Sequence, residues 1–258
     1  MGFLSDLVAE VRARLEREPL DAGRLLGLAL GLPPARDFAE ALRRAPVPAV
    51  IAEVKRASPS AGPIAEADAA ARARAYEAGG AAAISVLTEP RHFAGSLADL
   101  RAVHLAVSAP VLRKDFLVHP DQVIEARAAG ADAVLLIAAA LSRAELAAML
   151  RTATDLGLGA LVEVHTEPEL EAALEVGAEV IGVNARDLET LEVDPERALG
   201  LLARVPPDRI AVAESGIGTR AQVERAMAAG ARAVLVGEAL MRAEDPGALL
   251  RELAGVAG

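Results

Sequence analysis

The sequence contains no cysteine, only five aromatic residues, two lysines and one asparagine. Without cysteine the chain has neither a disulfide framework nor thiolate chemistry. No apolar run reaches the length that spans a membrane. The first 18 residues carry acidic and basic side chains at helical spacing, in place of the apolar core of a signal peptide. We therefore expect a soluble, cytoplasmic protein.

The chain is also short of positive charge. Its 27 Lys and Arg stand against 37 Asp and Glu, which gives a formal net charge of −10. Proteins that bind nucleic acid or an anionic membrane surface need positive charge where the phosphates lie. The charge balance therefore argues against both kinds of partner, while a small anion held in a local positive pocket stays compatible with it.

Lysine and asparagine are so rare that the positions that keep them are informative. Lys55 and Lys114 are the only lysines, and Asn184 is the only asparagine. Elsewhere Arg stands where Lys would be common, a pattern typical of nucleotide bias and of selection for heat resistance. At these three positions we expect the residue type itself to matter.

One unit recurs along the chain, namely an Ala-rich helix end, a Gly stop, two or three residues and an apolar strand. Its copies are EAGGAAAISVLT, EARAAGADAVLLIA, EAALEVGAEVIGVN and ERAMAAGARAVLVG. The Gly supplies a left-handed helix terminus, and the apolar run is typical of a parallel strand covered on both faces. With the strand-like runs between the copies, strands are predicted at 49–54, 82–87, 110–114, 133–137, 160–164, 180–183, 210–213 and 233–236.

Strands that alternate with helices in this number are typical of a (β/α)8 or TIM barrel. An open doubly wound sheet is the alternative, but no Gly-rich dinucleotide motif follows the first strand, and the even spacing favours closure. We therefore expect residues 1–258 to form a single barrel domain. Residues 1–45 are predicted to be an N-terminal helical extension that could cap one barrel end, with helices at 2–18 and 35–44 separated by LGLALGLPP.

Charged and polar residues gather where the predicted strands end. In chain order they are Glu53, Lys55, Lys114, Asp115, Glu163, His165, Asn184, Arg186, Asp187, Glu214 and Ser215. A single pair such as Glu53 and Lys55 is best explained as a surface ion pair at a strand exit. The C-terminal strand ends are, however, where barrel enzymes place their chemistry, and this set includes both lysines and the only asparagine. An active site therefore explains the set better than a series of surface pairs.

The last two strands indicate an anion site. Gly216 and Gly237 follow these strands, and a short helix is predicted to begin near Glu238. The loops after strands seven and eight are the usual phosphate site of such barrels, since backbone amides there face the anion. Each glycine alone would more often make a simple turn. Together with Ser58 and Ser60 in the first loop, the glycines favour a small phosphorylated substrate.

The sequence predicts no metal site and no serine or cysteine nucleophile. His92, His104, His119 and His165 share no ligand spacing, and there is no serine elbow. Acid/base chemistry by Lys and Glu is what remains. Phe93 and Phe116 follow strands at the same barrel end and could wall a pocket for a planar ring, with core packing an equal alternative for Phe116.

Motifs along nearly the whole chain resemble those of the indole-3-glycerol phosphate synthases. They are EVKRASPSAGPI, SVLTEPRHFAGS, VLRKDFLV, GADAVLLIAA, LVEVHTEPEL, IGVNARDLETLEVD, AESGI and LVGEALMR. NARDLET, combined with KRASPS and KDF, separates this family from phosphoribosylanthranilate isomerase and the tryptophan synthase α subunit. The resemblance implies a carbon-carbon carboxy-lyase of tryptophan biosynthesis. The implied reaction converts 1-(2-carboxyphenylamino)-1-deoxyribulose 5-phosphate to indole-3-glycerol phosphate, releasing CO2 and water without a metal or organic cofactor.

The resemblance also implies roles for individual residues. The implied catalytic residues are Lys114 as general acid, Lys55 at the substrate carboxylate and in dehydration, Glu53 and Glu163 as acid/base carboxylates, Asn184 at substrate hydroxyls, and Glu214 as a positioning group. The implied substrate-binding residues are Ser58, Ser215, Gly216 and Gly237 for phosphate, Phe93, Phe116 and Leu188 for the anthranilate ring, and Arg186. The division of acid/base work between the two glutamates and Lys55 stays open.

Two details of this assignment can be checked by geometry. Burial among apolar strand ends is expected to lower the pKa of Lys114, which would let it release a proton near neutral pH. Glu238 departs from the small polar residue expected in a phosphate loop, because a carboxylate there repels phosphate unless its side chain turns away.

Two other functions fit the same residues. A Schiff-base aldolase would also use a strand-end lysine such as Lys114. A phosphosugar-binding protein without activity would bind the substrate and release no CO2. The sequence does not decide whether the protein is a monomer or a weak dimer.

Overall fold

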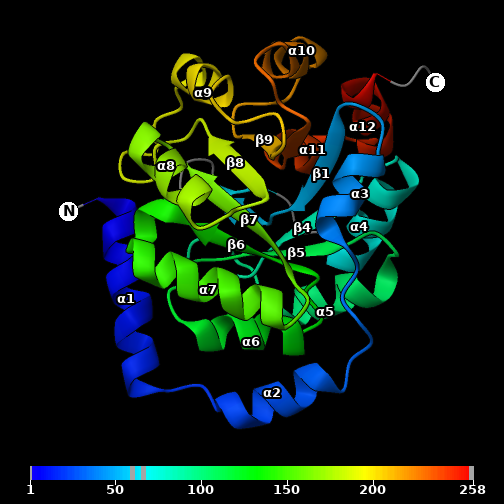
Figure 1. The fold of residues 1–258 in the computed structure, drawn as a ribbon. Coiled ribbons are helices and arrows are strands. Elements are labelled where there is room, and N and C mark those ends of the chain that lie inside the picture. Colours follow the sequence, from blue (N-terminus) through cyan, green and yellow to red (C-terminus); the bar gives the residue numbers. More distant parts are fainter. Residues whose placement is uncertain (1, 59–61, 65–67, 256–258) are drawn as a thin grey trace.

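The computed structural model describes residues 2–58, 62–64 and 68–255, and only the backbone of Ser58 and Pro63. Eight parallel strands close into a barrel in the order β1-β10-β9-β8-β7-β6-β5-β4 (Figure 1). They are β1 (Ala49–Val54), β4 (Ala83–Leu87), β5 (Val111–Lys114), β6 (Ala133–Ile137), β7 (Gly159–Val164), β8 (Val180–Asn184), β9 (Ile210–Glu214) and β10 (Ala233–Val236). The predicted (β/α)8 barrel is confirmed, and every predicted strand boundary lies within one residue of the observed one.

Helices connect the strands on the outside of the barrel. They are α4 (Ala69–Ala78), α5 (Leu97–Ala106), α6 (Pro120–Ala128), α7 (Arg143–Asp155), α8 (Glu167–Glu175), α9 (Pro195–Leu202), α10 (Arg220–Ala228), α11 (Glu238–Arg242) and α12 (Pro246–Ala254). The short helix predicted near Glu238 is α11. In the described part of the chain no helix combines the length and the apolar character needed to cross a membrane.

Local sequence signals set the helix boundaries. The side chains of Ser142 and Thr166, for example, accept backbone N–H groups in the first turns of α7 and α8. Left-handed glycines follow several helix ends, including Gly130 and Gly177. In the first copy of the repeated unit the left-handed residue is Gly80, with φ of 95°. These signals are local, which is why they can be recognised in sequence alone.

Three short elements lie between the barrel strands and helices. After β1 the chain forms a two-stranded antiparallel pair, β2 (Ala57–Ser58) and β3 (Gly62–Pro63). A 3-10 turn, η1 (Ala138–Ala140), follows β6. The β2–β3 pair belongs to the loop that leaves β1 at its C-terminal end.

The N-terminal extension contains three helices, not two. They are α1 (Phe3–Arg17), α2 (Ala22–Leu30) and α3 (Phe38–Arg44). The expectation that LGLALGLPP only separates two helices was wrong, because α2 occupies its first half. Asp21 caps α2 by accepting the Arg24 N–H at 2.9 Å, and α2 packs beneath α6 (Figure 1). This tertiary packing outweighs the low helix propensity of Gly27.

The extension reaches both ends of the barrel. At the N-terminal end, Phe38 and Leu42 of α3 are buried in one apolar cluster with the first inward-facing residues of the strands. A Cβ at Gly159 would lie 2.9 Å from the Cβ of Phe38, so this glycine makes room for the ring. At the other end, the Phe3 and Leu4 N–H groups donate to backbone carbonyls of the loop after β8 at 3.2 and 3.0 Å.

Candidate active site

The inward-facing row of the barrel changes from apolar to charged toward the C-terminal strand ends. The pairs that show this are Ile51 and Glu53, Leu112 and Lys114, Leu161 and Glu163, and Val212 and Glu214. Residues i and i+2 share a face of a strand, so each charged side chain points inward like the apolar one before it. The three glutamates are at most 3% exposed. The barrel thus brings together charges from strands that are distant in sequence.

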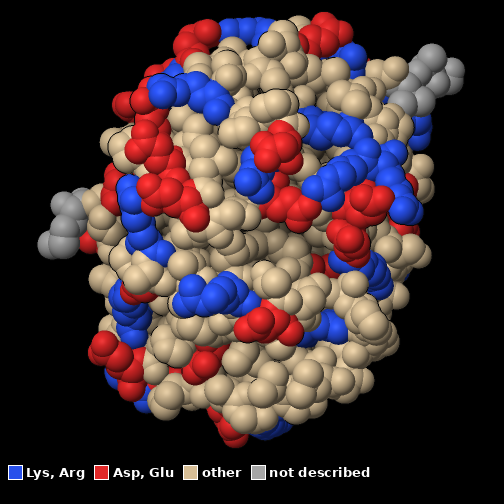
Figure 2. Space-filling model, in the orientation of Figure 1, with Lys and Arg blue, Asp and Glu red and all other residues tan. Residues whose placement is uncertain are grey.

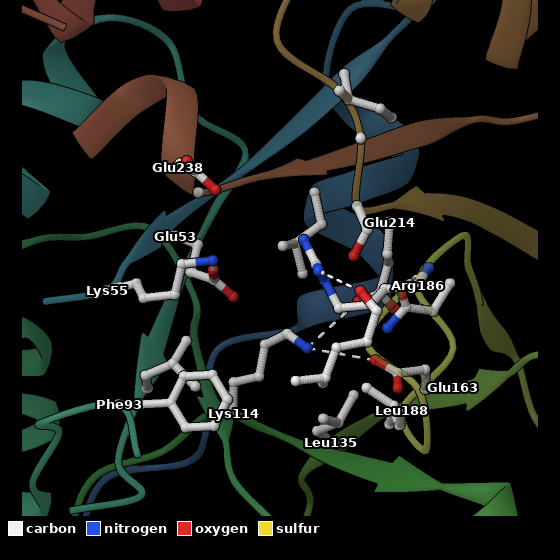
Figure 3. Close-up of a pocket in the computed structure, with 18 of the residues that line it drawn as sticks. Glu53, Lys55, Phe93, Lys114, Leu135, Glu163, Arg186, Leu188, Glu214 and Glu238 are labelled. Carbon is white, nitrogen blue, oxygen red and sulfur yellow. Dashed lines mark hydrogen bonds and ion pairs between the residues drawn. The ribbon is translucent and has the colours of Figure 1, made fainter. Parts of the chain in front are cut away.

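A cavity of about 440 Å³ opens at this end (Figure 3). It is lined by all but one of the predicted catalytic and substrate-binding residues, namely Glu53, Lys55, Phe93, Lys114, Phe116, Glu163, Asn184, Arg186, Leu188, Glu214, Ser215, Gly216 and Gly237. The exception is Ser58, whose backbone lies in β2 and whose side chain is outside the described part. Ser60 also lies outside the described residues. Of the other strand-end residues, His165 and Asp187 do not line the cavity.

Lys114 lies between two carboxylates. Its Nζ is 3.3 Å from Oε2 of Glu163 and 3.5 Å from Oε2 of Glu214, and Figure 3 shows Lys114 and Glu163 pointing toward each other. Burial by itself lowers the pKa of Lys114, but the nearby carboxylates of Glu163 and Glu214 outweigh it and raise the pKa above its usual value. The expected lowering of this pKa is therefore wrong. The sequence signal was burial alone, whereas the sign depends on carboxylates that other strands bring in.

The two carboxyl groups beside Lys114 differ in charge. Burial raises the pKa of Glu214 well above the usual range, and the negative charge of Glu163 raises it further. For Glu163 burial acts in the same sense, but Lys114 and His165 outweigh it and lower the pKa. Neither oxygen of Glu214 has a hydrogen-bond partner among the described residues. Glu163 is therefore the anion of the pair and Glu214 is the group that binds a proton first.

The second lysine has its own carboxylate partner. Nζ of Lys55 lies 3.2 Å from Oε1 of Glu53, and both line the cavity (Figure 3). The Tyr76 hydroxyl, buried behind β1, donates to the backbone carbonyl of Glu53 at 3.3 Å. This hydrogen bond holds the C-terminal end of β1, next to the Glu53 and Lys55 pair, in place.

Two glycines, each on or directly after the strand next to a buried glutamate, make room for Glu214 and Glu53. A Cβ on Gly182 of β8 would collide with Oε1 of Glu214 from β9. A Cβ on Gly237, directly after β10, would collide with Oε1 of Glu53 from β1. The space for each buried carboxylate is therefore provided by the absence of a side chain on the next strand.

Aromatic rings form one wall of the cavity. The centroids of Phe93 and Phe116 are 6.1 Å apart, and Phe3 approaches Phe116 edge-on at 6.4 Å. All three line the cavity with Leu188. Sequence reasoning missed Phe3, because its place depends on α1 returning to this barrel end. The only signal in the sequence was that Phe3 is one of only five aromatic residues.

A buried network holds the strand end that carries Lys114. The guanidinium of Arg113, on the outer face of β5, lies 2.9 Å from Asp115 Oδ2 and 2.9 Å from Glu125 Oε2. The Thr88 hydroxyl donates to Asp115 at 2.6 Å, and the other oxygen of Asp115 accepts the Phe116 N–H at 2.8 Å. The residues on either side of Lys114 are thus tied to β4 and α6, which limits the motion of the lysine backbone.

The loop after β8 is folded on itself at the cavity edge. Asn184 Oδ1 accepts the Arg186 N–H at 2.9 Å, and the Arg186 guanidinium donates to the Leu191 carbonyl at 2.8 Å. Asp187 Oδ1 accepts the N–H groups of Glu189 and Thr190, and Ser5 of α1 donates to Glu189. The loop and the start of α1 therefore support each other.

The loops after β9 and β10 form the opposite wall. Ser215 and Gly216 are both left-handed, with φ of 64° and 71°. Oε1 of Glu238 lies 3.2 Å from Nε of Arg242, and both residues line the cavity. The carboxylate that looked unfavourable beside phosphate is thus paired with a guanidinium. Sequence reasoning missed Arg242, although its i,i+4 spacing from Glu238 was a usable signal.

The histidines do not gather. His92 stacks edge-on against Phe3, His104 lies beside Asp132 at the far barrel end, His119 caps α6, and His165 contacts Glu163. Within the described ranges, no group of three or more His, Asp or Glu side chains is arranged to hold a metal ion.

Comparison with known proteins identifies the family. The family model described as indole-3-glycerol phosphate synthase matches residues 4–253. The indole-3-glycerol phosphate synthase of Nocardioides sp. is 54% identical over 259 residues, covering 99% of each chain. That of Micrococcus luteus is 52% identical over 258 residues, covering 97% of this chain and 96% of the relative.

Solved structures share the fold at much lower identity. A 3-hexulose-6-phosphate synthase superposes with a TM-score of 0.63 at 19% identity, covering 81% of this chain and 100% of that chain. A structure of the tryptophan synthase a2b2 complex from Pyrococcus furiosus has a TM-score of 0.60 at 16% identity, covering 82% and 99%. These likenesses show the barrel fold alone. The family match over nearly the whole length and relatives above 50% identity show that the chain belongs to the indole-3-glycerol phosphate synthase family.

Proposed function

We propose that this enzyme converts 1-(2-carboxyphenylamino)-1-deoxyribulose 5-phosphate to indole-3-glycerol phosphate in the cavity at the C-terminal strand ends. Membership of the family supports the activity. The observation that carries the location is the position of Lys114, between Glu163 and Glu214 in a cavity with an aromatic wall. A proton donor, a base and an apolar ring site are what ring closure, decarboxylation and dehydration require.

Lys114 acts as the proton donor in ring closure. The aryl carbon bonds to the ribulose carbonyl carbon, and the carbonyl electron pair moves onto oxygen, which takes a proton from Lys114. The raised pKa keeps this lysine protonated at neutral pH, as a donor must be. Its positive charge also stabilises the developing oxyanion among buried side chains. We assign Glu163 and Glu53 as the bases for the later proton transfers, and Asn184 as a residue that holds a substrate hydroxyl.

The aromatic wall receives the anthranilate ring. Phe93 and Phe116 are 6.1 Å apart and Leu188 lies in the same cavity lining, which supports a site for a planar ring. We add Phe3 to this wall. Lys55 and Arg186 line the same cavity and supply positive charge for the ring carboxylate, which must stay anionic until CO2 leaves.

The loops after β9 and β10 receive the phosphate. Ser215, Gly216 and Gly237 offer backbone amides at the cavity wall, with Ser58 from the first loop as a further partner. Arg242 adds a guanidinium to this wall and offsets the charge of Glu238.

Because the extension contacts both barrel ends, we propose that residues 1–258 act as one catalytic domain. We further propose that the protein is cytoplasmic and that it is a monomer or a weak dimer. Sedimentation of the purified protein decides between these two states.

Indole fluorescence tests the proposal directly. Purified protein mixed with the carboxyphenylamino-ribulose phosphate is expected to produce the fluorescent indole product and one CO2 per substrate, with and without EDTA. Binding of a product analogue without fluorescence would favour the phosphosugar-binding alternative. Substrate trapped on Lys114 by borohydride would favour a Schiff-base mechanism. A loss of turnover with EDTA that zinc or magnesium restores would overturn metal-free chemistry.

A further inference from the structure

His165 lies next to Glu163 but does not line the cavity. It follows the last residue of β7 and is 7% exposed. Its Nε2 is 3.5 Å from Oε1 of Glu163, and its Nδ1 is 3.2 Å from Oε2 of Glu169 on α8. The ring therefore connects a cavity carboxylate to a second carboxylate outside the barrel.

The contact between His165 and Glu163 is unusual in its hydrogen bonding. Oε1 of Glu163 and Nε2 of His165 are both buried, and neither has a hydrogen-bond partner among the described residues. An unpaired buried polar atom is unfavourable, so two that face each other call for an explanation. At 3.5 Å they lie just beyond hydrogen-bond length, and the contact becomes attractive once a proton sits between them.

Glu169, the outer of the two carboxylates that contact His165, reaches solvent. The Glu169 side chain is 20% exposed. Its Oε2 accepts the backbone N–H of His165 at 2.7 Å, and its Oε1 accepts the Thr166 hydroxyl at 2.9 Å. Glu169 is thus fixed in place while part of its carboxylate stays accessible to water.

The charges around His165 favour a ring that can take up a proton. Burial lowers the pKa of His165, but Glu169 and Glu163 outweigh it and raise the pKa, with Arg197 of α9 acting against them. Asp187 of the loop after β8 completes the charged surroundings. The pKa of Glu169 is lowered, because its hydrogen bonds from His165 outweigh burial. This order of pKa values favours inward transfer from Glu169 to His165. The charge of Lys114 is the main cause that lowers the pKa of Glu163, and it is absent once Lys114 has given up its proton, which favours the next transfer, from His165 to Glu163.

The reaction itself creates a need for protons. Ring closure transfers one proton from the enzyme to the carbonyl oxygen, and CO2 leaves the substrate carboxylate without a proton. Dehydration removes one proton from carbon and adds one to the leaving hydroxyl. Each turnover therefore removes one net proton from the enzyme, and Lys114 must be reprotonated before the next cycle.

We propose that Glu169, His165 and Glu163 form a relay that returns this proton from solvent to Lys114. Glu169 takes a proton from water and passes it to Nδ1 of His165, while Nε2 gives its proton to Oε1 of Glu163. Oε2 of Glu163 lies 3.3 Å from Nζ of Lys114 and completes the transfer to the neutral amine. Only O–H and N–H bonds change. The inference rests on the proposed acid/base role of Glu163 and Lys114.

Pre-steady-state kinetics of His165→Asn test the relay. Because the resting enzyme already holds its proton, the first turnover is expected within about threefold of the parent, followed by a steady state about 10- to 100-fold slower. Added imidazole buffer should raise this steady-state rate in proportion to its concentration, and leave the parent unchanged. Glu171→Gln, on an exposed position of the same helix, is the matched control and should behave as the parent.

A second variant keeps the test independent of folding at position 165. Glu169→Gln still offers an oxygen to the His165 N–H but has no acidic proton to transfer, so it should show the same burst and the same response to buffer. A first turnover slowed as much as the steady state, with no effect of buffer, would mean that His165 only holds Glu163 in place, and would overturn the relay. Wild-type turnover in Glu163→Gln would instead remove the acid/base assignment on which the relay rests.

Discussion

Two carboxylates are buried at opposite ends of the barrel, and their surroundings differ. Asp132, at the N-terminal end, is fully buried, and its two oxygens accept the backbone N–H groups of Arg36 at 2.8 Å and Val111 at 2.9 Å. Glu214, at the C-terminal end, is 2% exposed, yet neither oxygen has a hydrogen-bond partner among the described residues. Lys114 lies 3.5 Å from it.

The difference separates a stabilising role from a reactive one. Asp132 uses its acceptors to tie the N-terminal extension to the start of β5, so its burial is compensated. Glu214 keeps its acceptors unused beside a cavity, where a substrate hydroxyl or a proton can bind. A buried carboxylate thus supports the fold at one end and chemistry at the other, as the division of barrel ends leads us to expect.

The largest effect is expected at the charged end. Arg keeps its proton at any working pH, so Lys114→Arg should preserve the charge between Glu163 and Glu214 but not the proton transfer. We expect kcat to fall about 10²- to 10⁴-fold, or about 3–5 kcal/mol of barrier, with the melting temperature and phosphate-analogue affinity retained. Turnover within a few-fold of the parent would show that Lys114 serves only as a positive charge.

The opposite end should respond in stability. Asp132→Asn offers one acceptor where two N–H donors need one each, and its amide faces the other donor. We expect the free energy of unfolding to fall by about 2–4 kcal/mol in urea titrations, with kcat unchanged below the unfolding range. A loss of kcat without a loss of stability would break the distinction between the two ends.

The pH dependence of stability distinguishes Glu214 from ordinary carboxylates. Its folded-state pKa is raised, so the stability it contributes is complete below the unfolded pKa of about 4.3 and is lost as pH rises through the folded pKa. Relative to Glu214→Gln, the parent should therefore lose up to about 1.4 kcal/mol per pH unit above about pH 4.3. Urea unfolding of both proteins from about pH 5 to pH 8 measures this. A constant difference would contradict the raised pKa.

The smallest effect is expected on the surface. Arg143 and Glu175 form an exposed ion pair between α7 and α8. Arg143→Gln should change the free energy of unfolding by less than about 1 kcal/mol, and less again at high salt. This variant supplies the baseline for the variants at both barrel ends. A loss of unfolding free energy as large as that of Asp132→Asn would mean that burial does not explain why Asp132 matters more than an exposed charge.

Most of the fold could be predicted from local signals in the sequence. Apolar runs and glycine stops repeat along the chain, and each depends on a few neighbouring residues, so strand boundaries could be predicted closely. Helix α2 could not, because Gly27 weakens the local signal and the compensating contact with α6 is distant in sequence. Its existence depends on packing that no short window contains.

The candidate site was predictable where rarity marked a residue. Lys55, Lys114 and Asn184 stood out because the chain otherwise avoids lysine and asparagine. The protonation of Lys114 was not predictable, since its sign depends on carboxylates from two other strands. Phe3 was missed for a similar reason: its ring lies at the cavity because α1 contacts the loop after β8, where the Leu4 N–H donates to the Leu188 carbonyl.

The glycines opposite Glu214 and Glu53 have a consequence for redesign. Gly182 and Gly237 leave no space for a Cβ beside these carboxylates, so the present position of each glutamate depends on its facing glycine. Grafting this chemistry onto another barrel therefore means transferring two-residue units across neighbouring strands, and the glycine has to be installed first. In the reverse order, a side chain at the glycine position would push the buried carboxylate out of its place in the site.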